Sequence, residues 1–192
     1  MKHEIEAVIF RSPAGKLVIG DYCGKICLCD WAQHDDMPRK AILSRLLRLL
    51  PGCCGIRINP LPATPLLQEA VSQIEDYFDG KLSTFDLPIC PVGTPFQLTI
   101  WERIRQVGYG KTASYSDLII PDPESGGMAE SNPMLARAAA NATAANAMSI
   151  LIPCHRICRK GGIPHTGYAG GLEAKRLLLE LESCSRHHDI RP

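Results

Sequence analysis

The sequence predicts an α+β protein in which a small antiparallel sheet with helices precedes a mostly helical region. Short apolar segments separated by turn residues fill the first thirty positions, and amphipathic helical patterns dominate the remainder. The 192 residues have room for one large domain or two small ones. Hydrophobic residues make up 45% of the chain, which suffices for a packed core.

Three strands are expected near the N-terminus. Residues 4–10 alternate loosely between apolar and polar side chains and end at the turn formed by residues 12–15. Residues 16–20 and 26–29 supply two further strands, with residues 21–25 as the hairpin between them. Consecutive strands joined by such short turns favour an antiparallel meander.

Two helices are expected to follow the strands. Residues 39–50 place leucine and isoleucine side chains on one face, with Arg45 and Arg48 off that face. Thr64 can cap a second helix with Pro65 in its first position, and a glycine closes that helix. The basic, leucine-rich first helix could bind a partner protein, but its amphipathic pattern favours packing on the core.

The second half begins with an extended connection over residues 81–93. Thr94 then caps a helix that has Pro95 in its first position. The apolar stripe of this helix is expected to consist of Phe96, Ile100, Ile104 and Val107.

A helix-turn-helix with a long turn is expected next. Ser114 can cap a short helix that contains Tyr115 and Leu118, and Asn132 can cap a helix over about residues 133–145. This second helix is rich in alanine and has a single arginine, whereas recognition helices in the major groove usually carry long polar side chains. It should therefore discriminate little between DNA sequences. The net charge of only +1 predicts few phosphate contacts and modest, salt-sensitive DNA binding.

The nine cysteines are an odd number in irregular spacing, which favours reduced thiols and an intracellular protein. A structural zinc held by Cys23, Cys27, Cys29 and His34 is disfavoured. Cys27 and Cys29 have one residue between them and would face the same side of a strand. The N-terminus lacks a signal-peptide core, and no apolar run is long enough to span a membrane. We therefore expect a cytoplasmic protein, or a nuclear one in a eukaryote, without membrane contact.

Reactive side chains appear where an apolar run ends. Residues 150–152 form a short buried segment, Pro153 stops it, and Cys154 and His155 follow directly. A cysteine is a nucleophile only as its thiolate. A nearby histidine can take the thiol proton, directly or through one water, if a third group fixes the ring. The alternative is a buried structural cysteine beside a surface histidine.

The sequence around this pair resembles a known signature. Residues 153–156, preceded by Asn146 and followed by residues 166–172, are similar to the active-site signature of the methylated-DNA-protein-cysteine methyltransferases, the O6-alkylguanine-DNA alkyltransferases. Residues 93–101 and 109–115 resemble the opening of the same catalytic domain.

The resemblance implies a domain organisation and a function. The domains would be a ribonuclease-H-like scaffold over residues 1–85, a linker over 86–93, a catalytic DNA-binding domain over 94–184 and a tail over 185–192. The function would be DNA repair by direct, stoichiometric transfer of an alkyl group from O6-alkylguanine, with O4-alkylthymine as a second candidate, to a cysteine. The nucleotide would first be flipped out of the duplex through minor-groove binding. The resemblance implies a monomer that needs no cofactor and has alkylated double-stranded DNA as its partner.

Roles for the reacting residues also follow from the resemblance. Cys154 would be the alkyl acceptor, His155 the base acting through a water, Glu182 the carboxylate that orients His155, and Asn146 the tie between the helix-turn-helix and the active-site segment. Glu182 can point inward, because helical spacing places it on one face with Leu172, Lys175, Leu178 and Leu179. Glu180 would face away.

The resemblance further implies DNA contacts. Arg137 matches the arginine finger that fills the space of the flipped nucleotide, and Tyr115 matches the tyrosine that pushes on the target phosphate. Ala136 and Ala138 flank Arg137 on the helix that enters the minor groove, where small side chains fit. The loop between Tyr115 and Arg137 is longer than the usual turn of the family, so the position of Arg137 depends on alignment across an insertion.

The guanine pocket is expected to be lined by Tyr168, the backbone near Ile157, and Ala169, with the tyrosine as an aromatic wall. Ala169 stands where some members of the family have a serine. A thioether on Cys154 would be a poor leaving group with no acyl carbon for water to attack, so each molecule would act once.

Three other functions are weighed against this one. A lesion-binding, non-catalytic alkyltransferase-like protein would lack the nucleophile, contrary to the presence of Cys154 and Glu182. A helix-turn-helix regulator would need a polar recognition helix. A cysteine hydrolase using Cys154 and His155 would have no use for Arg137.

Overall fold

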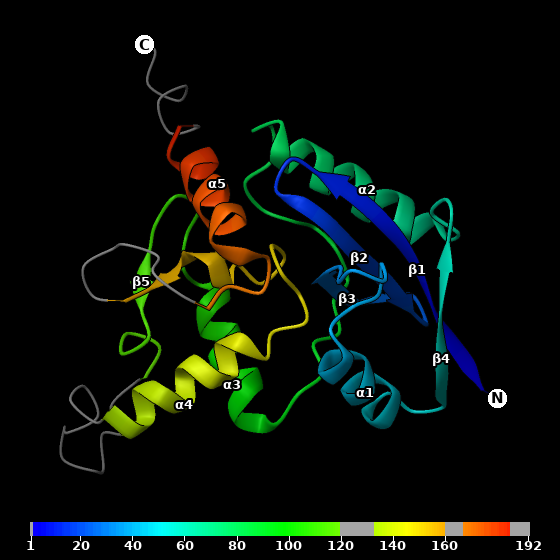
Figure 1. Cartoon of the computed structure of the whole chain (residues 1–192), viewed down its shortest axis with the longest axis horizontal. Coiled ribbons are helices and arrows are strands. Elements are labelled where there is room, and N and C mark those ends of the chain that lie inside the picture. The colour runs from blue at the N-terminus through cyan, green and yellow to red at the C-terminus, as the bar shows by residue number, and fades with distance from the viewer. Residues whose placement is uncertain (1, 120–132, 160–166, 185–192) are drawn as a thin grey trace.

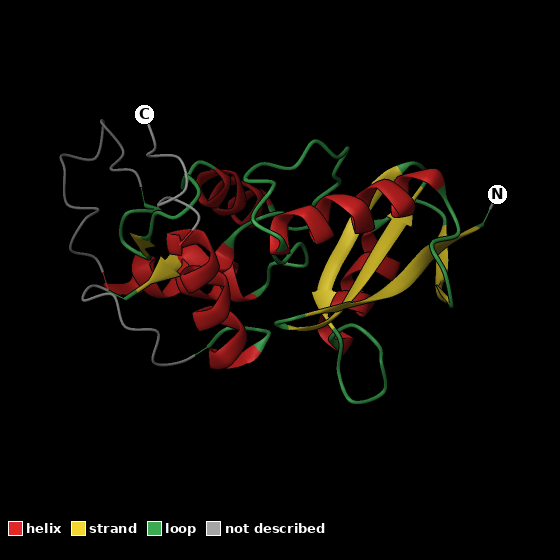
Figure 2. Ribbon diagram, turned by 90° about the horizontal axis from the view of Figure 1, so that it is seen from above, coloured by secondary structure: helices red, strands yellow, loops and turns green. Residues whose placement is uncertain are grey.

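The computed structural model describes residues 2–119, 133–159 and 167–184. The strands are β1 (His3–Ser12), β2 (Gly15–Tyr22), β3 (Lys25–Trp31), β4 (Cys53–Asn59), β5 (Ala113–Ser114) and β6 (Ile157–Cys158). The helices are α1 (Lys40–Leu49), α2 (Pro65–Phe78), α3 (Pro95–Arg105), α4 (Pro133–Ala144), the 3-10 helix η3 (Cys154–Arg156) and α5 (Gly171–Cys184). The four-stranded sheet lies on one side of the molecule, and α3, α4 and α5 lie on the other (Figures 1 and 2). The expected α+β class is confirmed.

The sheet is mixed, with the strand order β3-β2-β1-β4. β1 pairs antiparallel with β2, as in Val8 opposite Ile19, and β2 pairs antiparallel with β3. The expected antiparallel meander of the first three strands is confirmed. β4, which was not predicted, pairs parallel with β1, as in Ile5 opposite Ile56, so the sheet as a whole is mixed and not purely antiparallel. The chain leaves β3, passes through α1 and returns at the far edge of the sheet, and a crossover of this length permits parallel pairing.

A bulge in β3 separates the two cysteines that were expected to face the same side. Gly20 pairs with Leu28 and Asp21 with Ile26, so Cys27 is the additional residue. Cys27 consequently packs in the cluster that contains Ile5, whereas Cys29 belongs to the other buried cluster. The expectation for these two thiols is wrong, because the bulge breaks the alternation of side chains along the strand.

The predicted helix starts are confirmed by their capping bonds. Thr64 Oγ1 accepts a hydrogen bond from the backbone N–H of Leu67 at 3.1 Å, and Pro65 occupies the first turn of α2. Thr94 and Gln97 form a reciprocal capping box at the start of α3. Such caps satisfy N–H groups that have no partner inside the helix.

Two side chains expected on buried helix faces are exposed. Phe96 of α3 is 44% exposed, and Trp101 of the same helix is buried instead. Leu172, at the start of α5, is 43% exposed. Both residues lie in the first turn of their helices, where the helix has not yet reached the core, so the periodic pattern overestimates burial there.

The first half of the expected helix-turn-helix is not helical where it is described. Ala113 and Ser114 form β5, which pairs with β6, and residues 115–118 form turns. Ser114 Oγ still accepts a long 3.4 Å bond from the N–H of Asp117, so the predicted cap exists without a helix. The second helix, α4, begins at Pro133 as predicted, whereas the expected cap Asn132 lies outside the described residues.

The active-site segment continues the sheet of the N-terminal part. The N–H of Cys29 donates to the carbonyl of Ala147 at 2.8 Å, and the N–H of Ser149 donates to the carbonyl of Cys29 at 2.6 Å. One hydrophobic cluster joins Leu17 and Ile19 of the sheet to Ile100 of α3 and Ile152. The sheet therefore supports the segment that carries Cys154.

None of the helices among the described residues is both long enough and apolar enough to cross a membrane.

Candidate active site

Cys154 opens η3 at the end of a tight, buried turn. The backbone of Ile150 has φ 72°, a left-handed conformation that a β-branched residue seldom adopts. The N–H of Ile152 donates to the carbonyl of Met148 at 2.7 Å, and the N–H of Cys154 donates to the carbonyl of Ile152 at 2.7 Å. Cys154 is 6% exposed. The turn holds its thiol at the rim of the core, as the sequence predicted.

Asn146 binds both the turn and the thiol. Its Nδ2 donates to the carbonyl of Ile152 at 2.9 Å and to Cys154 Sγ at 3.2 Å, and its Oδ1 accepts from the N–H of Met148 at 2.9 Å. Burial raises the pKa of the Cys154 thiol, while the Asn146 donor acts to lower it. The amide therefore favours the thiolate in a site that otherwise disfavours charge.

His155 and Glu182 form a buried pair behind the cysteine. His155 Nε2 lies 2.8 Å from Glu182 Oε1, and neither side chain is exposed. Burial lowers the pKa of His155, which keeps the imidazole neutral at pH 7. Because an ionised carboxylate only accepts hydrogen bonds, Nε2 carries the ring proton and Nδ1 is left as a basic nitrogen. Nδ1 is buried and has no hydrogen-bond partner among the described residues.

Glu182 is the centre of a larger network. It accepts hydrogen bonds from Tyr77 Oη at 2.8 Å, from the N–H of Gly110 at 2.9 Å and from Arg156 Nε at 3.0 Å. Burial opposes the charge of Glu182, but the bonds from His155 and Arg156 outweigh it and hold the pKa at about 2. Glu180, on the same helix, has a side chain that is 65% exposed and points to Arg176, so it faces away as expected.

Arg156 is a site residue to which sequence reasoning gave no role. It is 6% exposed, binds Glu182, and donates from Nη1 to the carbonyl of Val107 at 2.6 Å. Its guanidinium neutralises the carboxylate that orients His155. The only sequence signal for this role was an arginine directly after a Cys-His pair that follows an apolar run. Its partners, Glu182 and Val107, are remote in sequence, so the role could not be assigned.

Two further arginines bind the C-terminal end of α4. One of them, Arg45, was expected to lie off the packing face of α1, the helix that carries it. Arg39 donates to the carbonyls of Ala144 at 2.8 Å and Asn146 at 2.6 Å, and it is paired with the buried Asp30. Arg45 donates to the carbonyl of Ala145 at 2.8 Å, and its guanidinium lies over the ring of Trp101. These carbonyls have no partner inside the helix, so the arginines of the N-terminal part cap the expected recognition helix.

A small hollow of about 20 Å³ adjoins Cys154. It brings together four of the predicted site residues, Tyr115, Asn146, Tyr168 and Ala169. Its other lining residues are Ala140, Thr143, Ala144, Gly167 and Lys175. Sequence reasoning missed the α4 residues among them, because alanine on every face of that helix hides which face is buried.

The remaining predicted positions do not line this hollow. The carbonyl of Ile157 accepts a 2.6 Å bond from Lys175 Nζ, so the backbone near Ile157 is already engaged. Arg137 is exposed on α4, and Ala136 and Ala138 beside it are half-buried. None of these three α4 residues lines the hollow.

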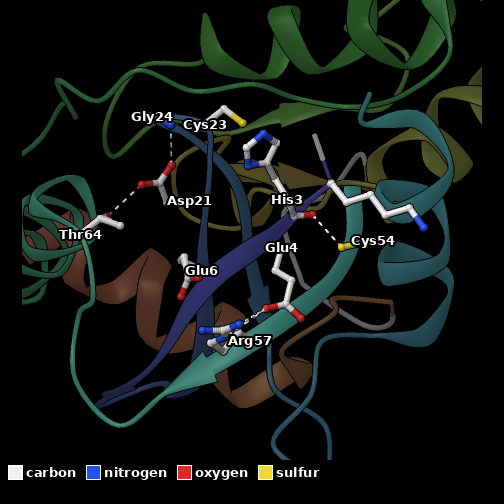
Figure 3. A pocket seen from close by; sticks show the side chains of 10 residues that line it. His3, Glu4, Glu6, Asp21, Cys23, Gly24, Cys54, Arg57 and Thr64 are labelled. Atoms are coloured by element: carbon white, nitrogen blue, oxygen red, sulfur yellow. Dashed lines mark hydrogen bonds and ion pairs between the residues drawn. The ribbon is translucent and has the colours of Figure 1, made fainter. Parts of the chain in front are cut away.

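A larger hollow of about 710 Å³ lies on the N-terminal sheet (Figure 3). Several of its charged groups are paired: Asp21 accepts bonds from the N–H of Gly24 and from Thr64, and Arg57 binds Glu4. Within the described part of the chain, no three histidine, cysteine or acidic side chains are grouped so that they could hold a metal ion. We assign no ligand to this hollow.

Comparison with known proteins finds sequence relatives of one family. The sequence model of the family described as 6-O-methylguanine DNA methyltransferase, DNA binding domain, matches residues 95–184. A methylated-DNA–protein-cysteine methyltransferase of Haemophilus influenzae is 40% identical over 62% of this chain and 62% of its own length. The constitutive enzyme of Bacillus subtilis is 38% identical over 64% of this chain and 69% of its own length.

Solved structures extend the similarity to nearly the whole chain. The crystal structure of Mycobacterium tuberculosis O6-methylguanine methyltransferase matches with a TM-score of 0.70 and 28% identity over 94% of both chains. The same relative in complex with DNA matches with a TM-score of 0.70, 27% identity and the same coverage.

The fold and the site together define a protein with a buried thiol that accepts a hydrogen bond and, next to it in the chain, a histidine paired with a buried carboxylate, the groups that cysteine-dependent enzymes use. The relatives narrow that class. The chain belongs to the methylated-DNA–protein-cysteine methyltransferase family, whose members repair O6-methylguanine in DNA by transferring the methyl group to one of their own cysteines.

Proposed function

We propose that this chain removes the alkyl group from O6-alkylguanine in double-stranded DNA by transferring it to Cys154, once per molecule. The observation that carries this proposal is the set of contacts around the thiol. Asn146 donates to Sγ, and His155, oriented by Glu182, presents a bare Nδ1 in the same buried site. A neutral base beside a hydrogen-bonded thiol is suited to forming a thiolate at neutral pH.

The target base must leave the duplex before it can reach a buried thiol. Arg137 suits this step, because it is exposed on α4 and its neighbours are alanines that permit close approach to the minor groove. Tyr115 is half-buried at the hollow beside Cys154, and we propose that it pushes on the phosphate of the target nucleotide. A purine is much larger than the hollow of about 20 Å³, so side chains around it must move on binding.

The transfer is a direct displacement. The Cys154 proton moves to His155 Nδ1, through a water where the two side chains do not meet directly. Sγ then bonds to the alkyl carbon while the bond from that carbon to guanine O6 breaks. The electron pair returns to the guanine, which takes up the proton lost by the thiol. The products are unmodified guanine and an S-alkylcysteine, and the reaction needs no metal or organic cofactor.

The thioether makes the reaction stoichiometric. It has no acyl carbon for water to attack and no good leaving group, so neither His155 nor Glu182 can regenerate the thiol. All nine cysteines are free in the structure. A reducing compartment, the cytoplasm or a nucleus, suits such a protein, and we propose that it acts there as a monomer.

The test is the intact mass of the protein after incubation with a duplex that contains O6-methylguanine, in the presence of EDTA. Wild type should gain one methylene, roughly 14 daltons, and never more than one per molecule. Cys154→Ala should gain nothing. Cys158→Ala is the matched control, because it removes another buried thiol of the same segment and should gain the same mass as wild type.

The outcomes separate the candidate functions. A duplex with O4-methylthymine tests the second substrate in the same assay. If wild type binds the O6-methylguanine duplex without gaining mass, the chain is a non-catalytic lesion-binding protein and the proposal is wrong. Transfer that continues in Cys154→Ala would also overturn it.

A further inference from the structure

Tyr77 of α2 reaches from the N-terminal part of the chain into the network behind the cysteine. Its side chain is 1% exposed, and its Oη donates to Glu182 Oε1 at 2.8 Å, although the two residues are 105 positions apart. His155 Nε2 lies at the same 2.8 Å from the same oxygen. Tyr77 and His155 therefore share one carboxylate oxygen, and a change at Tyr77 reaches His155 through a single atom.

Aromatic neighbours hold the phenol of Tyr77 in place. The ring of Phe85 lies 5.5 Å from that of Tyr77, and the ring of Tyr109 meets it edge-on at 6.1 Å. The guanidinium of Arg156 lies over the ring of Tyr109 in turn, 5.6 Å from its centre. A buried phenol packed in this way has few alternative positions, so its hydroxyl is pre-organised as a donor to Glu182.

The proton of this hydrogen bond belongs to the phenol. Burial raises the pKa of Tyr77 far above its ordinary value, as does the negative charge of Glu182, so the phenol is protonated at neutral pH. The pKa of Glu182 is about 2, so its carboxylate is ionised and can only accept hydrogen bonds. Tyr77 therefore donates to a full negative charge, which makes the bond stronger than one between neutral groups.

A second donor on Oε1 weakens the attraction of that oxygen for the imidazole proton. Burial lowers the pKa of His155, whereas the bond to Glu182 raises it. A donor that stabilises the carboxylate also makes it less basic, so the carboxylate favours an imidazolium less strongly. Without the Tyr77 hydroxyl, the pKa of His155 should rise.

We propose that Tyr77 is a positioning residue for the transfer, which fixes the Glu182 carboxylate against His155 and keeps the imidazole neutral, so that Nδ1 can take the Cys154 proton. This inference rests on the proposed function, because it requires that His155 is the base. It also gives the N-terminal part a role in the chemistry. The family model matches from residue 95, whereas Tyr77 belongs to α2.

Other titratable groups face the same pair of side chains, but they are identical in wild type and in the variants below. A difference in the behaviour of His155 between these proteins can therefore be assigned to the hydroxyl at position 77. These groups are Cys154 and Arg156 of η3, Lys175 of α5, Tyr109 and Tyr168.

The test is Tyr77→Phe, which deletes the hydroxyl and keeps the ring. In the free protein labelled with ¹⁵N-histidine, NMR should show His155 titrating at a higher pH than in wild type. Single-turnover transfer at pH 7.5 should fall about three- to tenfold, the effect of one lost hydrogen bond, and the fall of the rate at low pH should move upward with the titration. An unchanged titration of His155 would overturn the proposal, as would a wild-type rate of transfer.

Two further proteins separate this role from a merely structural one. Replacing Tyr77 with 3-fluorotyrosine makes the phenol more acidic and a stronger donor at nearly the same shape, so His155 should titrate at a lower pH than in wild type. A shift in the same direction as that of Tyr77→Phe would refute the role. Tyr22→Phe removes another buried hydroxyl of the N-terminal part, which donates to the carbonyl of Pro51 at 2.7 Å, and should change neither the titration nor the rate.

The two readouts distinguish the failure of this inference from that of the proposed function. If wild type transfers no methyl group, the proposed function fails, whatever the titration of His155 shows. If wild type transfers and His155 titrates alike with and without the Tyr77 hydroxyl, only the role of Tyr77 fails.

Discussion

Glu182→Gln is the change that most directly tests the network behind the cysteine. Glutamine keeps the shape of the side chain but removes its charge and replaces one acceptor oxygen with an N–H₂ donor. Glu182 accepts bonds from Tyr77, Gly110, His155 and Arg156, so the new donor must face at least one of these donors. The variant also leaves the buried guanidinium of Arg156 without its counter-charge.

The structure sets the size of the effect. A carboxyl pKa that falls from 4.5 in the unfolded chain to about 2 in the folded protein corresponds to about 3 kcal/mol of stability at pH 7. Removing one partner of a buried ion pair usually costs about 3–5 kcal/mol, which agrees. The direction of the pH dependence of stability follows from the lowered pKa of Glu182. The stabilisation is complete above pH 4.5 and is lost as the pH falls toward 2.

Urea unfolding at pH 7 and at pH 3 measures this directly. At pH 7 the variant should be less stable than wild type by about 3 kcal/mol, and at pH 3 the difference should shrink. Glu180→Gln, two residues earlier on α5, is the matched control and should stay within about 0.5 kcal/mol, because its side chain is exposed. A Glu182→Gln protein as stable as wild type at both pH values would refute the reasoning.

Three further predictions concern transfer and DNA binding. The single-turnover rate should be level around pH 6.5 and fall only at lower pH, because burial keeps the pKa of His155 below its ordinary 6.5; a rate that halves at pH 6.5 would contradict this. Asn146→Ala removes the donor to Cys154 Sγ and two bonds within the turn, so transfer should slow at least about tenfold. The rate at which iodoacetamide alkylates Cys154, measured as a function of pH, should show a higher thiol pKa in that variant. Arg137→Ala should weaken duplex binding and lower its salt dependence while unfolding stays within about 0.5 kcal/mol, since the side chain is exposed; unchanged DNA affinity would argue against the finger role.

Local signals in the sequence predicted local structure well. Thr64 with Pro65 and Thr94 with Pro95 marked helix starts correctly, because capping chemistry depends on residues within one turn. The position of Glu182 inside the molecule also followed from helical spacing. The division into domains at residues 86–93 stays a prediction.

Features that depend on distant partners were missed. β4 shows an alternating pattern around Ile56 and Ile58, but only the fold shows that it pairs parallel with β1. Arg45 appears on a helical projection as a solvated residue, yet it lies over Trp101 and caps α4. The bulge at Cys27 leaves no signature in a sequence of strongly β-forming residues. Each of these depends on pairing across the chain, which residue spacing does not contain.

The pairing of Cys29 with the segment 147–149 has a consequence for biosynthesis. Residues 88–90 pair with the edge of β3 at Ile26, but the N–H and C=O groups of Cys29 stay unpaired until residues 147–149 have been synthesised. This part of the edge is therefore available for pairing with other chains during synthesis. Slow translation or truncation before residue 147 should then favour aggregation. The buried network around Cys154 and His155 is completed only when α5 has been made, because that helix supplies Glu182.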